Sequence, residues 1–203
     1  MNTRTALAVL LLAAAAALSG CAAMVVGGAA AGVAVASDRR LTDVIGTDER
    51  IEIQSGEALT KRFGETVHIN VTSFNRQVLL SGEVPNAGAK AEAEAIVAKQ
   101  PDVRTVFNEL VVGPNSTLPN RSNDAYITSE VKARMTAAGK FNPLHVKVVT
   151  EANTVFLMGL VTRQEGQDAA EIARTGSGVR RVVRIFEYIV PPPPKPAEVE
   201  KKT

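Results

Sequence analysis

The chain has 203 residues, a formal net charge of +2 and a single cysteine. The near balance of charge argues against a nucleic-acid-binding protein that works by bulk electrostatic attraction, and no basic run is interleaved with aromatic residues. Tryptophan is absent and aromatic residues make up only 4% of the chain, so Val, Ile, Leu and Ala must build most of any core.

Residues 1–20 have the layout of a secretory signal peptide. Arg4 supplies a positive start, an apolar run covers residues 6–18, and small residues follow. This run is too short to span a bilayer comfortably, but the charge-free stretch continues to Ser37, so an uncleaved membrane helix is the alternative. The Ala- and Gly-rich composition of residues 22–36 argues against that alternative, because these residues partition poorly into hydrocarbon.

Cys21 ends the sequence LSGC, which resembles the lipobox of bacterial lipoproteins. The resemblance implies cleavage before Cys21, a diacylglyceryl group on its thiol and acylation, typically by palmitate, of its new amino group. Two or more acyl chains hold a protein stably on a membrane. Ala22 and Ala23 follow where inner-membrane lipoproteins of enteric type often carry Asp. The resemblance therefore implies a lipid anchor in the outer membrane, facing the periplasm.

Three stretches are expected to be irregular. Residues 21–45 pass from small residues to SDRRLTD and are interpreted as a lipid-anchored flexible tether. The sequence GPNSTLPNRSN, residues 113–123, carries two prolines and predicts an interdomain linker, placed at residues 114–121. Residues 191–203 open with four prolines and end in charges, which is typical of a disordered tail.

An internal repeat occupies the rest of the chain. Residues 67–84 align without gaps with residues 144–161, at an offset of 77 and with six identities in 18 positions. The identical pairs are His68 and His145, Val71 and Val148, Val78 and Val155, Leu80 and Leu157, Gly82 and Gly159, and Val84 and Val161. The repeat indicates duplication of one small module, with a first module at residues 46–113 and a second at residues 122–190.

Each module is predicted to have the order α-β-β-α-β. Alternating apolar residues indicate two strands joined by a turn, near residues 73–76 in the first module and 151–153 in the second. Asn86 is expected to cap a helix that Pro101 stops, and the second copy offers a helix over residues 167–174 that Gly176 ends. Residues 103–112 and 179–190 are predicted to be the closing strands.

A weaker amphipathic helix precedes each set of strands. Its apolar face is formed by Ile51, Ser55, Leu59 and Phe63 in the first module, and by Ile127, Val131, Met135 and Ala138 in the second. The predicted fold class is α+β, with two tandem modules that are each a three-stranded mixed sheet covered by two helices.

This order of elements resembles the BON domain. The segments INVT, VLLSGEVPN, SNDAYITSEVKARM and VFLMGLVT together resemble outer-membrane lipoproteins with two BON domains, of the DolP type. The resemblance covers nearly the whole mature chain and departs in the proline-rich tail and at Tyr126, where a larger aromatic is expected. It implies a non-enzymatic periplasmic protein that supports envelope integrity and cell division, and whose second domain binds anionic phospholipid such as phosphatidylglycerol or cardiolipin. A protein adaptor of the envelope, without direct lipid recognition, is the alternative.

Charge and helix geometry place the expected lipid contact in the second module. Residues 46–113 have 7 Lys and Arg against 10 Asp and Glu, whereas residues 122–190 have 9 against 7. On the helix that opens the second module, Tyr126 shares one flank with two alanines and has basic residues on neighbouring faces. Packing of Tyr126 against the other module is the structural alternative. The predicted lipid-binding residues are Tyr126, Glu130, Lys132, Ala133, Arg134 and Ala137.

Other candidate residues favour structural roles. Gly82 and Gly159 interrupt strands rich in Val and Leu, which is typical of a bulge or a close backbone approach. His68 and His145 alternate with apolar neighbours and are expected on a polar or domain-contacting strand face. No metal site is expected, because no Cys, Asp or Glu cluster has ligand spacing around these histidines. No catalytic motif and no cofactor site is predicted, while protein partners in the envelope remain open.

Overall fold

The structure, a computed structural model, describes residues 38–64 and 67–190. The expected signal peptide, Cys21, most of the expected tether and the Pro-rich tail lie outside these residues. The described residues from Arg39 onward form one compact unit that holds both modules. Within the described ranges, no helix combines the length and the apolar character needed to cross a membrane.

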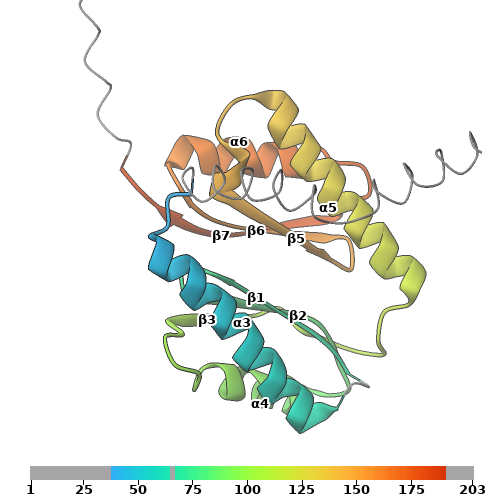
Figure 1. The fold of residues 1–203 in the computed structure, drawn as a ribbon. Helices are drawn as coiled ribbons and strands as arrows, with labels where there is room; N and C mark the ends of the chain where they lie inside the picture. Colours follow the sequence, from blue (N-terminus) through green and yellow to red (C-terminus); the bar gives the residue numbers. More distant parts are fainter. Residues whose placement is uncertain (1–37, 65–66, 191–203) are drawn as a thin grey trace, which may run out of the picture. The chain divides into compact units, whose positions relative to one another are not determined.

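The first module is a mixed sheet with two helices on one face (Figure 1). Its central strand, β2, pairs antiparallel with β1 and parallel with two short strands, β3 and β4. In chain order its elements are α3 (Thr42–Phe63), β1 (His68–Phe74), β2 (Gln77–Val84), α4 (Ala87–Val97), β3 (Thr105–Asn108) and β4 (Val111–Val112).

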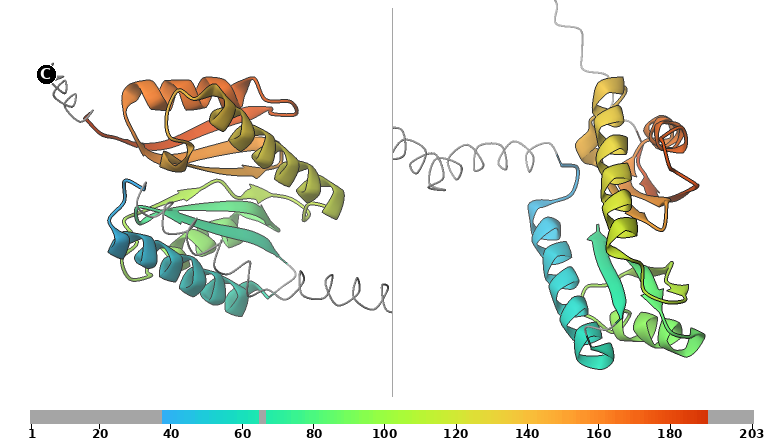
Figure 2. Two further views of the ribbon diagram at one scale, coloured as in Figure 1. Left: turned by 45° about the horizontal axis from the view of Figure 1, so that its top comes forward. Right: turned by 90° about the vertical axis from the view of Figure 1, so that its right-hand side faces the viewer.

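The second module repeats this plan with one continuous closing strand, and its helices again lie on one face of the sheet (Figure 2). Strand β6 pairs antiparallel with β5 and parallel with β7. Its elements are α5 (Leu118–Ala138), the 3-10 helix η1 (Pro143–His145), β5 (Val146–Glu151), β6 (Thr154–Val161), α6 (Arg163–Arg174) and β7 (Arg181–Tyr188). The predicted α+β class and the α-β-β-α-β order are confirmed in both modules.

The closing strand of the first module differs from its prediction because it is split. Asn108 turns its side chain out of the strand, donating to the carbonyl of Lys90 and accepting from the backbone N–H of Leu110. Leu110 is buried in the core instead of continuing the ladder. Strands β3 and β4 therefore pair with β2 separately, and the first sheet has four strands where three were expected.

The predicted tether and linker both extend too far. Helix α3 already begins at Thr42. Before it, Arg40 forms an ion pair with Asp48 at 2.8 Å, and its guanidinium lies over the Phe74 ring. Helix α5 begins at Leu118, inside the expected linker, because the Thr117 side chain caps it by accepting from the Asn120 N–H. The folded part is therefore larger at both of these boundaries than the sequence indicated.

Two helix boundaries depend on side-chain caps. Asn86 caps α4 as expected, accepting from the Ala89 N–H at 2.8 Å. Helix α6 begins four residues earlier than predicted, because Thr162 and Glu165 form a reciprocal capping box. On α5, the expected apolar face is wrong at one position, since Ala138 in the last turn is exposed.

Each module has its own apolar core between its helices and its sheet. In the first, Ile51 and Leu59 of α3 pack with Val78 and Leu80 of β2 and with Ala93 of α4. In the second, the buried residues include Ile127, Val131 and Met135 of α5, Val155 and Leu157 of β6, and Ala169 and Ala173 of α6.

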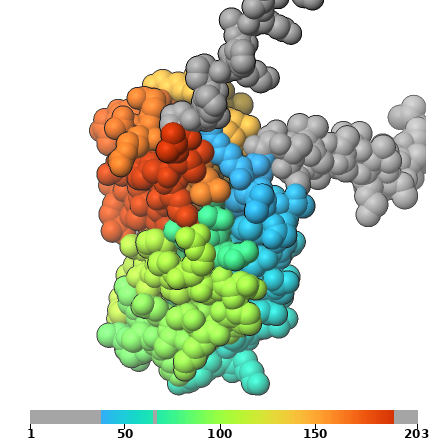
Figure 3. All heavy atoms as spheres, turned by 90° about the vertical axis from the view of Figure 1, so that its left-hand side faces the viewer, coloured from blue at the N-terminus to red at the C-terminus, as the bar shows by residue number. Residues whose placement is uncertain are grey.

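A third apolar cluster joins the two modules. Phe74 and Leu79 from the first sheet are buried together with Phe156, Met158 and Ile185 from the second. Because successive strand residues point to opposite faces, Leu79 and Phe156 face away from the cores that contain their neighbours. Figure 3 shows the two modules in contact at the surface, with the second module in orange and red against the first in green and blue. The modules are thus packed sheet against sheet.

We call the buried residues Phe74, Leu79, Phe156, Met158 and Ile185 the inter-module cluster. Polar contacts also join the two modules. Lys147 of β5 pairs with Glu52 of α3 at 2.7 Å. Arg181 of β7 pairs with Glu109 at 2.9 Å. Further contacts between modules join Asn75 and Arg104 to Glu187, Asn70 to Glu151, and Arg39 to Glu165.

The hairpin turn of each module is held by a buried aspartate from the preceding helix. Asp124 of α5 accepts from the N–H groups of Ala152 and Asn153, which both have positive φ. Asp48 of α3 accepts in the same way from Asn75 and Arg76, also at positive φ. Two consecutive positive-φ residues form the tight turn that suits the twist of a hairpin.

The strand glycines Gly82 and Gly159 lie where another backbone approaches. A Cβ on Gly82 would stand 2.1 Å from the carbonyl oxygen of His68, and Gly82 also has a φ of +115°. A Cβ on Gly159 would stand 2.4 Å from the carbonyl oxygen of His145. Neither distance is tolerable, so the β-hairpin backbone requires glycine at both positions.

Candidate lipid-binding surface

The outward face of α5 carries the residues expected to contact lipid. Its inward face is set by the buried residues Asp124, Ile127, Val131 and Met135, which recur every three or four positions. Tyr126 points the other way and is 65% exposed. This exposure rules out the alternative in which Tyr126 packs against the other module.

Small and basic residues accompany Tyr126 on this face. Ala133 and Ala137 are exposed and lie within about 20° of Tyr126 around the helix, at about 100° per residue. Lys132 is exposed and lies about 120° around the helix from Tyr126. It forms no ion pair among the described residues. The helix therefore presents an aromatic ring, small apolar side chains and an uncompensated positive charge to solvent.

The sequence reasoning missed Leu118, which is 77% exposed in the first turn of α5. It lies two turns before Tyr126, on the same exposed side of the helix. The helical spacing between Leu118 and Tyr126 can be read from the sequence, but residues 114–121 were interpreted as linker. Leu118, Tyr126, Lys132, Ala133 and Ala137 together are called the α5 surface below.

Glu130 and Arg134, which were also expected to contact lipid, are engaged in structural contacts. Arg134 donates to the carbonyl of Thr175 and, at 2.7 Å, to its hydroxyl. Glu130 lies 3.6 Å from Arg134 and accepts from the N–H of Ser177 at 3.4 Å. These two side chains tie α5 to the loop after α6.

Next to these contacts lies a shallow groove of about 370 Å³ between α5 and α6. It is lined by Arg134, Ala137, Ala138, Glu171, Ile172 and Thr175. The groove is continuous with the α5 surface through Ala137.

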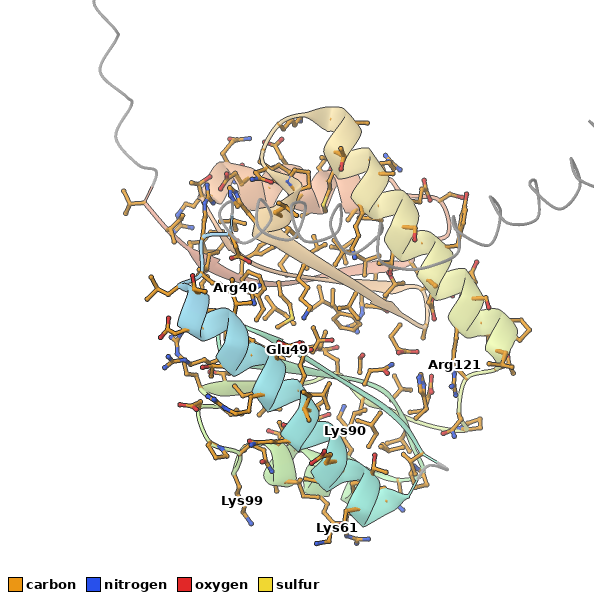
Figure 4. All side chains as sticks on the ribbon, in the orientation of Figure 1. Arg40, Glu49, Lys61, Lys90, Lys99 and Arg121 are labelled. Atoms are coloured by element: carbon orange, nitrogen blue, oxygen red, sulfur yellow. The ribbon has the colours of Figure 1, made fainter. Side chains whose placement is uncertain are left out.

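Most other cations of the second module are paired. Lys140 binds Asp168 at 2.8 Å, and Arg174 binds Glu171 at 2.7 Å on the same helix. Of the first module's cations, Lys61 and Lys99 project into solvent near the ends of α3 and α4 (Figure 4). The first module is nevertheless net negative, whereas the second is net positive.

The structure also brings together a polar cluster that the sequence reasoning excluded. His68 lies opposite Glu83 in the β1–β2 ladder, and Glu151 of the second module lies beside both. We call these three residues the His68 cluster. The sequence analysis found no Cys, Asp or Glu cluster with ligand spacing around His68, because cross-strand and inter-module neighbours are invisible to spacing along the chain.

Burial dominates the electrostatics of the His68 cluster. Desolvation raises the pKa of the Glu151 carboxyl, although the nearby His68 and a hydrogen bond from Asn70 act in the opposite direction. Glu83 and Glu151 are each only 7% exposed. Two buried carboxylates thus face one imidazole.

Comparison with known proteins identifies the repeated module. A model of the BON domain matches residues 47–114 and 123–188, which are the two modules described above. The chain belongs to the BON-domain family. Its two modules are therefore called the first and second BON domains.

Proteins of several bacteria are similar to this chain over most of its length. The outer membrane lipoprotein DolP of Haemophilus influenzae is 37% identical over 157 residues, covering 76% of this chain and 81% of that protein. A 21 kDa hemolysin of Actinobacillus pleuropneumoniae is 32% identical over 144 residues, covering 70% and 74%. The osmotically-inducible protein Y of Escherichia coli is 31% identical over 121 residues, covering 58% and 60%. The expected likeness to a DolP-type protein with two BON domains is confirmed.

Proposed function

We propose that this protein is a periplasmic lipoprotein, anchored in the outer membrane through acylated Cys21, whose second BON domain binds anionic phospholipid. In this role it supports envelope integrity, including at the division site. The location named for the Haemophilus influenzae relative and the LSGC sequence support the anchor. The observation that carries the lipid-binding proposal is the exposed aromatic and apolar side of α5, together with Lys132, which forms no ion pair among the described residues.

The chemistry of the α5 surface suits a membrane interface. Tyrosine favours the headgroup boundary, where its ring is half buried and its hydroxyl stays hydrated. Leu118 can insert its side chain slightly deeper, since 77% of it is exposed. Each basic residue near an anionic surface adds about 1 kcal/mol. Lys132 therefore makes the attraction depend on anionic lipid and on ionic strength.

An anchored protein needs only weak affinity at this site. Seventeen residues separate Cys21 from Arg39. A chain of that length reaches at most about 60 Å when extended, so the folded unit stays near its own leaflet. The local concentration of headgroups is then high, and a few weak contacts suffice to turn α5 toward the bilayer.

Vesicle sedimentation tests this function. The chain from residue 21 onward, carrying Cys21→Ser to remove the anchor, should bind vesicles in proportion to their phosphatidylglycerol or cardiolipin content, and should bind less as salt rises. Tyr126→Ala with Lys132→Glu should abolish most of this binding while circular dichroism stays unchanged.

Lys99→Glu is the matched control, because it makes the same charge change at an exposed residue of the first BON domain. It should bind vesicles nearly as well as the parent. If the double variant binds as tightly as this control, the α5 surface is not the lipid site. Binding that ignores anionic lipid altogether would favour the protein-adaptor function instead.

A further inference from the structure

The His68 cluster has the composition and spacing of a cation site. Nδ1 of His68 lies 2.8 Å from Oε2 of Glu83 and 4.0 Å from Oε1 of Glu151. One ligand atom from each of the three residues lies within 4.8 Å of the other two, and no other such group occurs in the described ranges. The first BON domain supplies two of these residues and the second supplies one.

Burial makes this arrangement costly without a cation. Removing two carboxylates from water is unfavourable unless positive charge and hydrogen bonds compensate. Arg121 lines the cavity beside the cluster, but its Nε donates to the hydroxyl of Ser116. Asp124 lines the same cavity and adds further negative charge. Glu83 accepts a hydrogen bond from the Ser116 N–H and Glu151 accepts one from Asn70, but a single imidazole faces the negative charge of both carboxylates.

We propose that the His68 cluster binds a divalent first-row transition metal ion, with Zn²⁺ the best fit. Zinc takes imidazole nitrogen and carboxylate oxygen at about 2.0–2.2 Å in tetrahedral geometry, which places neighbouring ligand atoms about 3.3–3.6 Å apart. The observed separations of 2.8 and 4.0 Å lie on either side of that value. Side-chain movements of about half an ångström bring these two separations to that value.

A fourth ligand and an entry path are both at hand. The hydroxyl of Ser116 lies 3.3 Å from Nδ1 of His68. A cavity of about 270 Å³ opens beside the cluster, with His68, Asn70 and Glu151 in its wall. Either the hydroxyl or a water molecule from this cavity completes the tetrahedron.

Asn70 is placed to orient the imidazole. Its Nδ2 lies 3.2 Å from Nε2 of His68 and donates to Oε2 of Glu151 at 2.9 Å. When Nδ1 binds the metal, Nε2 carries the ring proton. Once Glu151 moves onto the metal, the Asn70 amide no longer donates to it and turns its oxygen toward the ring. A hydrogen bond from the second nitrogen to a carbonyl is the usual support of a metal-bound histidine.

The second domain lacks the residues equivalent to Glu83 and Glu151, so its histidine, His145, serves as an internal control. At the offset of 77, His68 corresponds to His145, but Glu83 corresponds to Leu160 and Glu151 corresponds to Phe74. His145 lies 3.7 Å from Glu165 and belongs to no group of three potential ligands in the described residues. Zinc binding is thus expected at one domain's histidine and not at the other's.

Metal titration tests the proposal directly. The chain from residue 21 onward with Cys21→Ser is used, because this removes the one thiol that could bind zinc elsewhere. After chelator treatment it should bind one Zn²⁺, and bound Co²⁺ should give the intense visible absorption of tetrahedral coordination. Zn²⁺ should also raise the melting temperature, because it binds only the folded chain and joins the two domains.

Isosteric variants distinguish the His68 cluster from other sites. Glu151→Gln and, separately, Glu83→Gln should weaken Zn²⁺ affinity by more than about 100-fold, and Asn70→Ala by about tenfold. His145→Asn and Glu187→Gln should bind as the parent does, since Glu187 contacts Asn75 and Arg104 instead. Circular dichroism confirms folding of each variant. Absence of binding by the parent, or equal binding by folded Glu83→Gln or Glu151→Gln, would overturn the proposal.

Discussion

Replacing Asp124 by alanine should destabilise the second BON domain strongly, although Asp124 contacts neither lipid nor metal in our account. Asp124 is 4% exposed, and its carboxylate accepts from two turn N–H groups, at 3.0 Å from Ala152 and 2.8 Å from Asn153. Each donor left unsatisfied costs about 1–3 kcal/mol. Because Ala152 is exposed, water can replace part of the loss, so we expect about 2–4 kcal/mol.

Urea denaturation followed by circular dichroism measures this change in the free energy of unfolding. A melting temperature lower by about 5–10 °C should accompany it. Asp168→Ala is the control, because Asp168 forms a surface ion pair with Lys140 and should cost less than about 1 kcal/mol. If Asp124→Ala costs no more than this control, the hairpin turn does not depend on the aspartate.

Three further predictions concern the lipid anchor, the inter-module cluster and the stability of the folded chain at acidic pH. Cys21→Ser should release the protein from outer membranes washed with carbonate, and a variant that stays in the pellet would contradict the anchor. Phe156→Ala should cost about 3–5 kcal/mol and increase amide exchange in both BON domains, whereas an increase in the second alone would show that the domains unfold independently. Although desolvation raises the pKa of Glu165, hydrogen bonds from Arg39 and Thr162 lower it to about 2 from an ordinary 4.5. Because the pKa of Glu165 is lower in the folded state, Glu165 contributes stability above pH 4.5 that is lost as the pH falls toward 2. Glu165→Gln should therefore make the free energy of unfolding depend less on pH between 2 and 4.5. An unchanged dependence on pH in this window would refute the prediction.

The strands and the order of elements could be predicted because they depend on patterns within short segments of the chain. Alternation in residues 67–84 and 144–161 needs no tertiary information, and Asn86 marks a helix start by its own side chain. The split of the closing strand could not be predicted, since it depends on Asn108 reaching the carbonyl of Lys90 on a different element.

The candidate sites were predictable to different degrees. Tyr126 and Lys132 follow from helix periodicity, whereas the engagement of Arg134 depends on where the loop at Thr175 comes to lie. A two-residue turn at Asn75 and Arg76 would already have paired His68 with Glu83, so this part of the His68 cluster was within reach. Glu151 was not, because only packing of the two sheets brings it there.

The central claim is that α5 of the second BON domain enters an anionic membrane interface, and a single tryptophan tests it most directly. The chain contains no tryptophan, so Tyr126→Trp introduces a fluorophore whose emission reports on that site alone. On addition of phosphatidylglycerol vesicles, we predict a blue shift of the emission and quenching by brominated lipid, both lost at high salt. Tyr188→Trp, at a tyrosine that packs against Phe186 and Arg163, should show neither change. Emission from the Tyr126→Trp protein that stays unshifted and unquenched with anionic vesicles would contradict the account.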